Sequence, residues 1–523
     1  MIFLPLAAAA LVAVFRSRDG GATRWIALGG SLATLLVSLV IAGKYVALPP
    51  VAGDDGGPVQ PRVELRHTWI DFGGDANVRL ELFLGLDGVS LLLVVLTALL
   101  TVAAVLYCWG RPRERSTEFY AAILALETSL LGAFCAFDLL LFYIFFEFTL
   151  IPLFFLIGLW GGPDRRRAAQ RFFLYTLCGS LVTLIGLVAL AMTAAGRLGL
   201  ETPFSIPDLS AALAAAPLPY ELQVGLFLAI SFGFAIKMPL IPLHTWQPLA
   251  YVEAPTAATV LLSGAVMKLG TYGFFRICLP MLPDAVESVG VPLVATLSVI
   301  GILYGALGAL AQRDLKRLIA YSSISHIGFC TLGLFALNIE GISGGVLQMI
   351  NHGVTTGALF LMIGMIYDRY RTRQLTRLGG LATRLPLLTS CFVFVCFASM
   401  GLPGLNNFIG EFLSLAGMFA AHPGFAAAGT LGVVLGAWYL LSMLQRGFFG
   451  PLREPGGRGE IPDLRLREAL LLAPLLALCL GIGVHPRPLL EIIEPDVRRV
   501  VRLYDDDVAE SPIHVAEIND TAH

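Results

Sequence analysis

The feature that most constrains the folding of this chain is a succession of apolar runs that recurs along its 523 residues. A helix of about 20 apolar residues crosses the hydrocarbon core of a bilayer, and inside that core every backbone polar group must be satisfied within the protein. We therefore predict an all-α polytopic membrane protein with fourteen transmembrane helices. They are expected at residues 2–15, 25–43, 82–107, 118–137, 139–160, 170–195, 223–251, 256–279, 289–311, 318–338, 343–366, 386–420, 425–447 and 467–484.

The composition agrees with a membrane location. Hydrophobic residues make up 57% of the chain and charged residues 14%, with a mean hydropathy of +0.78, whereas soluble domains carry roughly 25% charged residues. The eight cysteines form no close CxxC pair, so the sequence predicts neither an iron–sulfur cluster nor a zinc site. It contains no glycine-rich phosphate-binding loop, so we expect no bound nucleotide. We also expect no nucleic-acid partner.

Lysine and arginine are distributed unequally between the two sets of loops. The loops after odd-numbered spans hold 23 of the 35 basic residues, and the opposite loops, in which we count Arg276, hold 10. Only Lys237 and Lys268 are placed inside spans. Because the cytoplasmic loops of membrane proteins are enriched in Lys and Arg, this asymmetry predicts that both termini lie on the non-cytoplasmic side.

Two spans are interrupted by helix-breaking residues. Pro239 and Pro242 interrupt the seventh span directly after Lys237, and Gly401 and Pro403 interrupt the twelfth. The breaks are five helices apart, which predicts two inverted five-helix repeats; chance placement of Gly and Pro is the alternative. The expected organisation is three N-terminal helices in residues 1–112, the first repeat in 113–284, the inverted second repeat in 285–450, and the last helix with a polar tail in 451–523.

Six ionisable residues lie well inside the expected spans: Glu147, Lys237, Lys268, His326, His352 and Glu411. A charge at the bilayer centre costs about 2.5–3.5 kcal/mol on insertion scales, so each such side chain needs a partner or water. We expect them to transfer protons, with Glu147 and Lys237 as an opposite-charge pair. A purely structural ion pair is the alternative, and so is a Lys237 side chain that reaches the interface from a kinked helix.

The remaining members of this set are expected to continue the path. Lys268 is placed near the membrane midplane, about 18 Å into its span at 1.5 Å per residue. His326 and His352 have small or hydroxylated neighbours that leave room for water, and histidine can relay protons; a histidine that is merely hydrogen-bonded is the alternative. Three further acids are placed nearer the span ends, namely Glu127 as a candidate for gating water, Asp138 as an interfacial cap, and Glu253.

Six segments together carry a resemblance to a known family. They are Leu86–Thr97, Phe145–Pro152, Lys237–Trp246, Glu253–Ala257, Tyr321–Gly328 and Gly401–Phe412. The pattern closely resembles the antiporter-like membrane subunits of respiratory complex I (NADH:quinone oxidoreductase), of the bacterial chain M type that corresponds to mitochondrial NADH dehydrogenase subunit 4. Glu411 in the twelfth helix and the short tail after the fourteenth favour this type over its paralogues.

The resemblance implies a fold, a function and a set of partners. It implies fourteen helices with an inverted repeat, and proton translocation coupled to quinone reduction elsewhere in the complex. The implied residues are Glu147, Lys237, Lys268 and Glu411, with the two histidines as links. This chain is expected to carry out no redox chemistry and to bind no cofactor itself; NADH, FMN, iron–sulfur clusters and quinone are expected in partner subunits. Those partners include two antiporter-like paralogues in the inner (cytoplasmic) membrane.

One departure from the family pattern concerns the loop after the seventh helix. The family usually has an acid and a histidine after the proline, where this chain has Leu249 and Tyr251. The sequence therefore leaves open whether protons are taken up from the cytoplasm by that route. Two alternative functions also stay open: a subunit of a multi-chain sodium/proton antiporter, and a membrane anchor of a hydrogenase-like complex.

Overall fold

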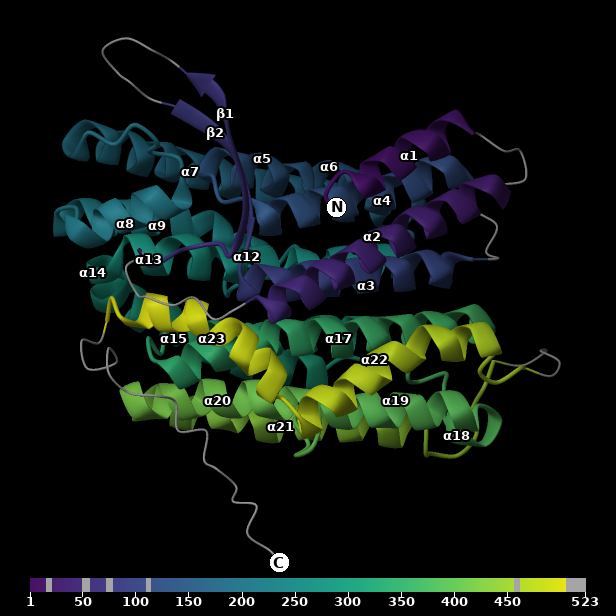
Figure 1. Cartoon of the computed structure of the whole chain (residues 1–523). Helices are drawn as coiled ribbons and strands as arrows, with labels where there is room; N and C mark the ends of the chain where they lie inside the picture. The colour runs from purple at the N-terminus through teal and green to yellow at the C-terminus, as the bar shows by residue number, and fades with distance from the viewer. Residues whose placement is uncertain (16–20, 49–56, 72–78, 110–113, 456–460, 505–523) are drawn as a thin grey trace, which may run out of the picture.

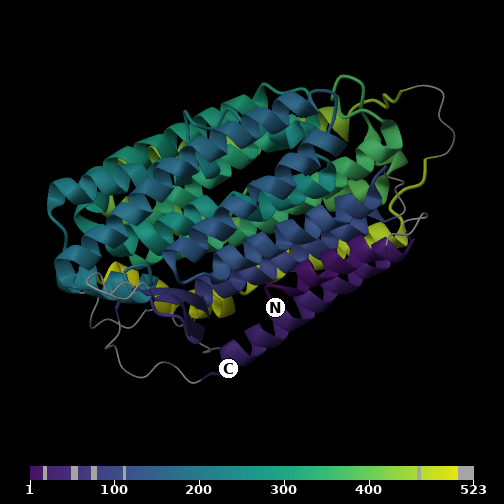
Figure 2. The same cartoon turned by 90° about the horizontal axis from the view of Figure 1, so that it is seen from above.

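Long helices packed side by side form the body of the molecule (Figure 1). The computed structural model describes residues 1–15, 21–48, 57–71, 79–109, 114–455 and 461–504. The axes of most helices lie roughly along one line, and a view turned by 90° shows the same arrangement from above (Figure 2). The connecting segments therefore gather at the two ends of the bundle.

The first half of the chain contains the two strands of the structure and the helices up to the first break. The elements are α1 (Leu4–Val14), α2 (Gly21–Ala47), β1 (Val63–Asp71), β2 (Arg79–Leu86), α3 (Gly88–Cys108), α4 (Ser116–Cys135), α5 (Leu139–Phe148), α6 (Leu150–Trp160), α7 (Arg165–Leu198), α8 (Ile206–Ala215), α9 (Tyr220–Lys237) and α10 (Gln247–Glu253).

The second half begins with one long helix that alternates between α and π geometry. The elements are α11 (Thr256–Leu261), η2 (Leu262–Val266), α12 (Lys268–Gly273), η3 (Phe274–Cys278), α13 (Leu279–Met281), α14 (Pro283–Ala285), η4 (Val286–Gly290), α15 (Val291–Leu310), α16 (Leu315–Leu334), α17 (Ile339–Tyr370), α18 (Leu381–Arg384), α19 (Pro386–Ser399), α20 (Asn406–Ala421), α21 (Pro423–Gly447), α22 (Leu466–Val484) and α23 (Arg487–Val501).

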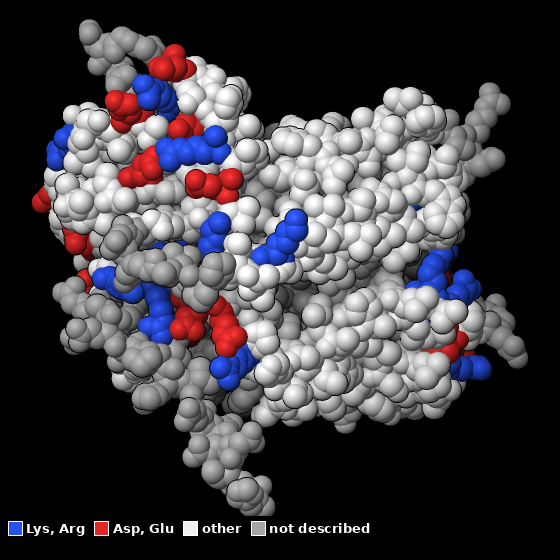
Figure 3. Space-filling view, viewed as in Figure 1, with Lys and Arg blue, Asp and Glu red and all other residues white. Residues whose placement is uncertain are grey.

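The lengths and composition of these helices fit a multi-pass membrane protein. Within the described residues, eleven helices are long and apolar enough to cross a bilayer. The other three expected spans correspond to the short α1, to α16, and to the interrupted pair α19 and α20. Charged side chains gather at the two ends of the molecule and leave a largely uncharged surface between them (Figure 3). Such a belt is what the hydrocarbon core of a bilayer requires.

Both predicted helix breaks are present. Helix α9 ends at Lys237, and turns occupy the chain before α10 begins at Gln247. The twelfth expected span divides into α19 and α20, with residues 400–405 between them. Gly401 and Gly404 have φ values of 75° and 89°, a left-handed conformation that glycine adopts without the steric penalty of a side chain. The fifth expected span is also divided, because α5 ends at Phe148 and α6 begins at Leu150.

The all-α expectation was wrong for residues 63–71 and 79–86. The strands β1 and β2 pair antiparallel as a two-stranded sheet, so residues 82–86 do not belong to the third helix. Arg66 of β1 forms ion pairs with Glu81 and with Asp208 of α8. Burial raises the pKa of Asp208, but hydrogen bonds from Arg66, Thr202 and Ser205 lower it more, so the pKa lies below its ordinary value. Asp208 therefore stays ionised and holds the hairpin on α8.

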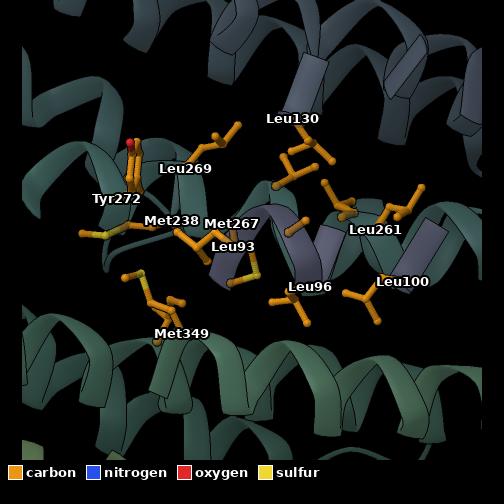
Figure 4. Packing of buried hydrophobic residues seen from close by; sticks show 14 of the residues in the cluster. Leu93, Leu96, Leu100, Leu130, Met238, Leu261, Met267, Leu269, Tyr272 and Met349 are labelled. Atoms are coloured by element: carbon orange, nitrogen blue, oxygen red, sulfur yellow. The ribbon is translucent and has the colours of Figure 1, made fainter. Parts of the chain in front are cut away.

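The apolar core that positions the site lies where α3 meets the helix from α11 to α12 and helix α17. Leu93, Leu96 and Leu100 of α3 point into this contact, which Figure 4 shows together with Met267 and Met349. Their side chains are at most 3% exposed. Burial of this kind contributes roughly 25 cal/mol per Å² of apolar surface, so this region holds the two halves of the chain against each other.

Candidate site of buried ionisable residues

Lys237 occupies the last position of α9, at the first helix break. Its ammonium group lies at the negative end of the helix dipole, which favours a cation. The break frees carbonyl groups of the last turn, and these find new donors: Trp246 Nε1 donates to the Ile236 carbonyl at 2.9 Å, and the Leu240 amide donates to the Ala235 carbonyl at 2.8 Å. The break is therefore hydrogen-bonded and ordered rather than frayed.

The Lys237 side chain is buried against the end of α5. Its Nζ donates to Thr149 Oγ1 at 2.8 Å and to the Phe146 carbonyl at 3.3 Å. It also lies 4.3 Å from the centre of the Phe146 ring, a cation–π contact. Thr149 stands at the junction of α5 and α6, where the helix is interrupted. That junction supplies the hydroxyl and the carbonyl that solvate the ammonium.

Glu147 and Lys237 come close to one another but do not form the expected ion pair. Within the described residues, no carboxylate–ammonium contact of 4.0 Å or less joins them, although their charges interact electrostatically. The Oε1 atom of Glu147 is buried without a hydrogen-bond partner. The structure therefore has the pair open, with Thr149 in the place where the carboxylate was expected.

Lys268 is fully buried and contacts His352. The sequence did not predict this contact. Its Nζ lies 2.6 Å from His352 Nδ1 and donates to the Ser263 carbonyl at 2.6 Å. The Ser263 carbonyl is available because Leu262–Val266 forms a π-helical segment, in which hydrogen bonds shift by one residue. An ammonium and an imidazole at this distance share one proton, which can reside on either nitrogen.

Two glycines explain why Lys268 and His352 meet. Gly264 lies one turn before Lys268, and Gly353 directly follows His352. A Cβ atom added at Gly353 would stand 2.8 Å from the Gly264 carbonyl oxygen, which is closer than such atoms approach. The absence of a side chain at Gly353 lets α17 approach the backbone of Gly264, and the absence of one at Gly264 leaves room for Leu100 of α3.

His326 continues the path from His352 to Glu411. The two imidazole rings have their centres 5.8 Å apart. His326 Nδ1 lies 2.7 Å from Glu411 Oε1, and Gln348 Nε2 donates to the same oxygen at 3.0 Å. The other ring nitrogen of His326 faces the Tyr439 hydroxyl at 3.4 Å. All these groups are buried, so polar side chains bridge a region with no bulk water.

Glu411 lies beside the second helix break. A Cβ atom added at Gly401 would stand 3.2 Å from Glu411 Oε2. The left-handed backbone at Gly401 therefore also leaves room for the carboxylate. Asn351 and Asn406 hold the start of α20 against α17, since each amide nitrogen donates to the backbone carbonyl of the other residue, at 2.8 and 3.3 Å. Both breaks thus lie next to an ionisable side chain, as the sequence predicted.

The secondary acids behave differently from one another. Asp138 caps α5, as expected, because its Oδ1 accepts from the amides of Leu140 and Leu141. Glu253 Oε2 accepts from the Asp164 amide at 2.9 Å and so fixes the loop before α7. The placement of Glu127 near a span end was wrong: it lies in the middle of α4, fully buried, and neither carboxylate oxygen has a partner among the described residues.

A cavity opens at the end of the bundle that carries α18. It has a volume of about 620 Å³ and is lined by Glu253, Asp368, Lys316, Thr256 and Tyr107 among others. The Tyr107 hydroxyl contacts Asp368 Oδ2 at 3.2 Å and Thr256 Oγ1 at 3.4 Å. Thr256 begins the helix that leads to Lys268. Tyr251 does not line this cavity; its hydroxyl donates to the Leu262 carbonyl at 3.3 Å.

Several contributors to the site were missed by sequence reasoning. Thr149, Gln348, Ser263 and Tyr439 are ordinary polar residues of membrane helices, and only their distances to charged groups reveal a role. Spacing could have indicated Gln348, which precedes His352 by one turn and so shares its face of α17. In the described parts of the chain, no group of three or more His, Cys, Asp or Glu side chains is arranged to hold a metal ion.

Comparison with known proteins identifies the family to which this chain belongs. The model of the family described as "NADH:quinone oxidoreductase/Mrp antiporter, TM" matches residues 136–436. The chain belongs to this family. The matched region contains all six helices that carry the ionisable residues of the site, namely α5, α9, α12, α16, α17 and α20, and it contains both helix breaks. The matched residues therefore include all six ionisable residues of the site.

Relatives in the family match almost the whole chain. NADH-quinone oxidoreductase subunit M of Rhodobacter capsulatus is 41% identical over 520 residues, covering 97% of this chain and 96% of the relative. NADH-ubiquinone oxidoreductase chain 4 of Marchantia polymorpha is 37% identical over 506 residues, covering 96% of each.

Solved structures of the family share the fold. A chain of respiratory complex I from Thermus thermophilus with bound NADH superposes with a TM-score of 0.82 at 33% identity, covering 96% of this chain and 99% of that one. A chain of the Mrp complex from a Dietzia species reaches 0.78 at 22% identity, covering 97% and 96%. The second likeness shows the fold alone.

Proposed function

We propose that this chain is a proton-translocating membrane subunit of an NADH:quinone oxidoreductase, with no redox chemistry of its own. The observation that carries the proposal is the buried path Lys268–His352–His326–Glu411, in which two contacts of 2.6 and 2.7 Å flank a pair of imidazoles. Its ionisable groups can bind and release protons in turn. The names of the Rhodobacter and Marchantia relatives and the Thermus complex support the assignment to such an oxidoreductase.

The finer architecture is part of this proposal. Fourteen transmembrane helices include α1, α16 and the pair α19 and α20 besides the eleven longer spans. Residues 113–284 and 285–450 form two inverted repeats, between a three-helix segment in 1–112 and a last helix with its tail in 451–523. The two breaks, one at Lys237 and one beside Glu411, support this symmetry. Both termini lie on the non-cytoplasmic side of the inner membrane, following the arginine-rich loops.

Coupling passes through the open pair Glu147 and Lys237. When Lys237 rests on Thr149, its positive charge is not neutralised by Glu147 and disfavours a second charge on Lys268. When Lys237 moves to Glu147, the two charges neutralise each other. Opening of the pair therefore releases a proton from Lys268 toward His352, and closing allows reloading. Partner subunits, including two antiporter-like paralogues, supply the neighbouring charges that move the pair. They also hold the NADH, FMN, iron–sulfur and quinone sites.

Reloading takes place through the cavity lined by Glu253, Asp368 and Thr256. It lies on the side that the arginine-rich loops assign to the cytoplasm, at the start of the helix that carries Lys268. Thr256, Thr259 and Ser263 follow along this helix at three- and four-residue spacing, so they share one face. This route does not need the acid and histidine that Leu249 and Tyr251 replace. In this proposal, protons are taken up from the cytoplasm through this cavity and not through the loop that carries Leu249 and Tyr251.

Two experiments test the function. Purification of the intact assembly from native membranes and identification of its subunits by mass spectrometry should reveal NADH- and quinone-binding partners. Their absence, together with sodium-dependent proton exchange, would favour the antiporter instead. In reconstituted complex, Lys237→Ala should abolish redox-driven pumping while NADH oxidation continues. Full pumping after loss of Lys237, Lys268 and Glu411 together would favour the membrane anchor.

A further inference from the structure

A second buried charge cluster lies on the same helix as Lys268, nearer the other end of the molecule. It consists of Tyr272 and Arg276 of the Lys268 helix, Asp87 before α3, and Asp496 of α23, and it is called the outer cluster below. The sequence analysis counted Arg276 among loop residues, which was wrong: it lies within the span Thr256–Met281 and is 2% exposed. A buried arginine in a membrane helix requires an explanation.

The outer cluster stands directly in line with Lys268. Lys268, Tyr272 and Arg276 are spaced by four residues, which places them on one face of the helix, and Arg276 lies about 12 Å beyond Lys268 at 1.5 Å per residue. Arg276 Nε donates to the Tyr272 hydroxyl at 3.1 Å. That hydroxyl in turn donates to the Phe134 backbone carbonyl at 3.1 Å. Tyr272 and Arg276 therefore follow Lys268 along this helix toward the end that the outer cluster occupies.

The contacts of Arg276 fix its guanidinium in this position. It forms an ion pair with Asp87, which is 1% exposed. Its guanidinium carbon lies 4.7 Å from the ring centre of Phe137 and 5.1 Å from that of Tyr272. Asp87 also caps α3, since its Oδ1 accepts from the Ser90 amide at 2.9 Å. The charge can neither rotate away nor lose its proton, because arginine stays protonated in proteins.

Helix α23 closes the outer cluster from outside. Asp496 Oδ2 accepts from the amides of Gly88 and Val89 at 2.7 and 3.2 Å. A Cβ atom added at Gly88 would stand 1.9 Å from the Ile492 carbonyl oxygen, so the two backbones are in direct contact. Figure 1 shows α23 crossing the end of α3. The cluster is thereby shut off from water on its outer side.

We infer that the outer cluster is a proton seal: Arg276 blocks direct escape of protons from Lys268 to the non-cytoplasmic side. Two properties of the cluster act together. The guanidinium has no lone pair with which to accept a proton, and its ion pair with Asp87 holds that carboxylate in place. The Tyr272 hydroxyl ends on a backbone carbonyl, which cannot pass a proton on. The only acceptor that touches Lys268 among the described titratable groups is His352, so protons move sideways into the second half of the chain.

The seal rests on the proposed function, and passive proton leak tests it separately. Intact complex is reconstituted in liposomes, a pH gradient is imposed without NADH, and its decay is followed with a pH-sensitive dye. Because Arg276→Gln alone leaves Asp87 buried without its partner, the decisive variant is Arg276→Gln with Asp87→Asn, in which both members are neutral. It should leak several-fold faster than the parent. Arg276→Lys, which keeps the charge, should stay tight, as should the control Arg487→Gln in the exposed pair with Glu491.

Adding Lys268→Met to the neutral double variant should abolish the leak, because the leak runs through Lys268. A fully assembled neutral variant that is as tight as the parent would overturn the seal, and so would a leak that persists without Lys268. Failure of the proposed function would be seen in a different measurement. The single variant Lys268→Met would then pump protons at the parental rate, however fast the pH gradient decays in the Arg276 variants.

Discussion

The link between Lys268 and His352 is the narrowest point of the path, and replacement of His352 tests it. His352→Leu introduces an apolar side chain of similar volume and removes the acceptor that lies 2.6 Å from Lys268 Nζ. The ammonium then keeps the Ser263 carbonyl, which cannot carry a proton onward. A hydrogen bond to a charged group contributes about 1.5–3 kcal/mol. Each 1.36 kcal/mol corresponds to a tenfold change in rate.

Proton transfer out of Lys268 should therefore slow by about 10- to 100-fold in His352→Leu. The assay compares NADH-driven acidification of proteoliposomes with uncoupled NADH oxidation in the same preparation. Pumping should fall while the uncoupled rate is kept, since the proposed function places the redox sites in partner subunits. His352→Gln, which can hydrogen-bond but cannot bind a proton at neutral pH, should behave like the leucine variant. His422→Gln, at the exposed end of α20, is the matched control. Parental pumping by both His352 variants would refute the reasoning.

Two further sets of substitutions probe the junction at Thr149 and the break at Gly401. Thr149→Val removes the hydroxyl that holds Lys237 away from Glu147, and the loss of this hydrogen bond to a buried charge costs about 1–3 kcal/mol. Pumping in vesicles should fall several-fold, and Thr149→Ser should restore it. An unimpaired valine variant would show that the hydroxyl has no role. Gly401→Ala and Gly404→Ala both strain a left-handed backbone by about 1–2 kcal/mol, but only the first crowds Glu411. Thermal unfolding should show similar losses of stability, whereas pumping should fall further in Gly401→Ala; equal pumping would contradict the crowding.

Much of the fold can be predicted from the sequence because a membrane helix is recognised from the residues within it. Span positions depend on runs of apolar residues, and the breaks at Pro239 and Gly401 depend on residues that cannot continue a helix. Strand β2 was missed because it runs almost directly into the apolar start of α3, so its last residues were counted with that helix, and its partner β1 was missed with it. Helix α23 was missed because its burial depends on a contact with α3 that is more than 400 residues away in sequence.

The site was predictable in its members but not in its contacts. A carboxylate, lysine or histidine inside an apolar span is conspicuous by itself, so the sequence alone singles out these six ionisable residues as candidates. That Lys237 contacts Thr149 and not Glu147, and that Lys268 meets His352, are facts of packing. They depend on the junction at Thr149 and on the bare backbone at Gly264 and Gly353, whose meaning appears only when two helices are brought together. Arg276 was misplaced for the same reason, since its position near a span end hides its complete burial.

The number of protons translocated per NADH oxidised is the most direct test of the central claim that Lys268 passes protons to Glu411 through the two histidines. The measurement uses intact complex in proteoliposomes and compares the parent with Lys268→Met, under conditions in which both reduce quinone at the same rate. The path described above predicts that the variant translocates fewer protons per NADH than the parent. An unchanged ratio would contradict it, because protons would then cross this subunit without Lys268.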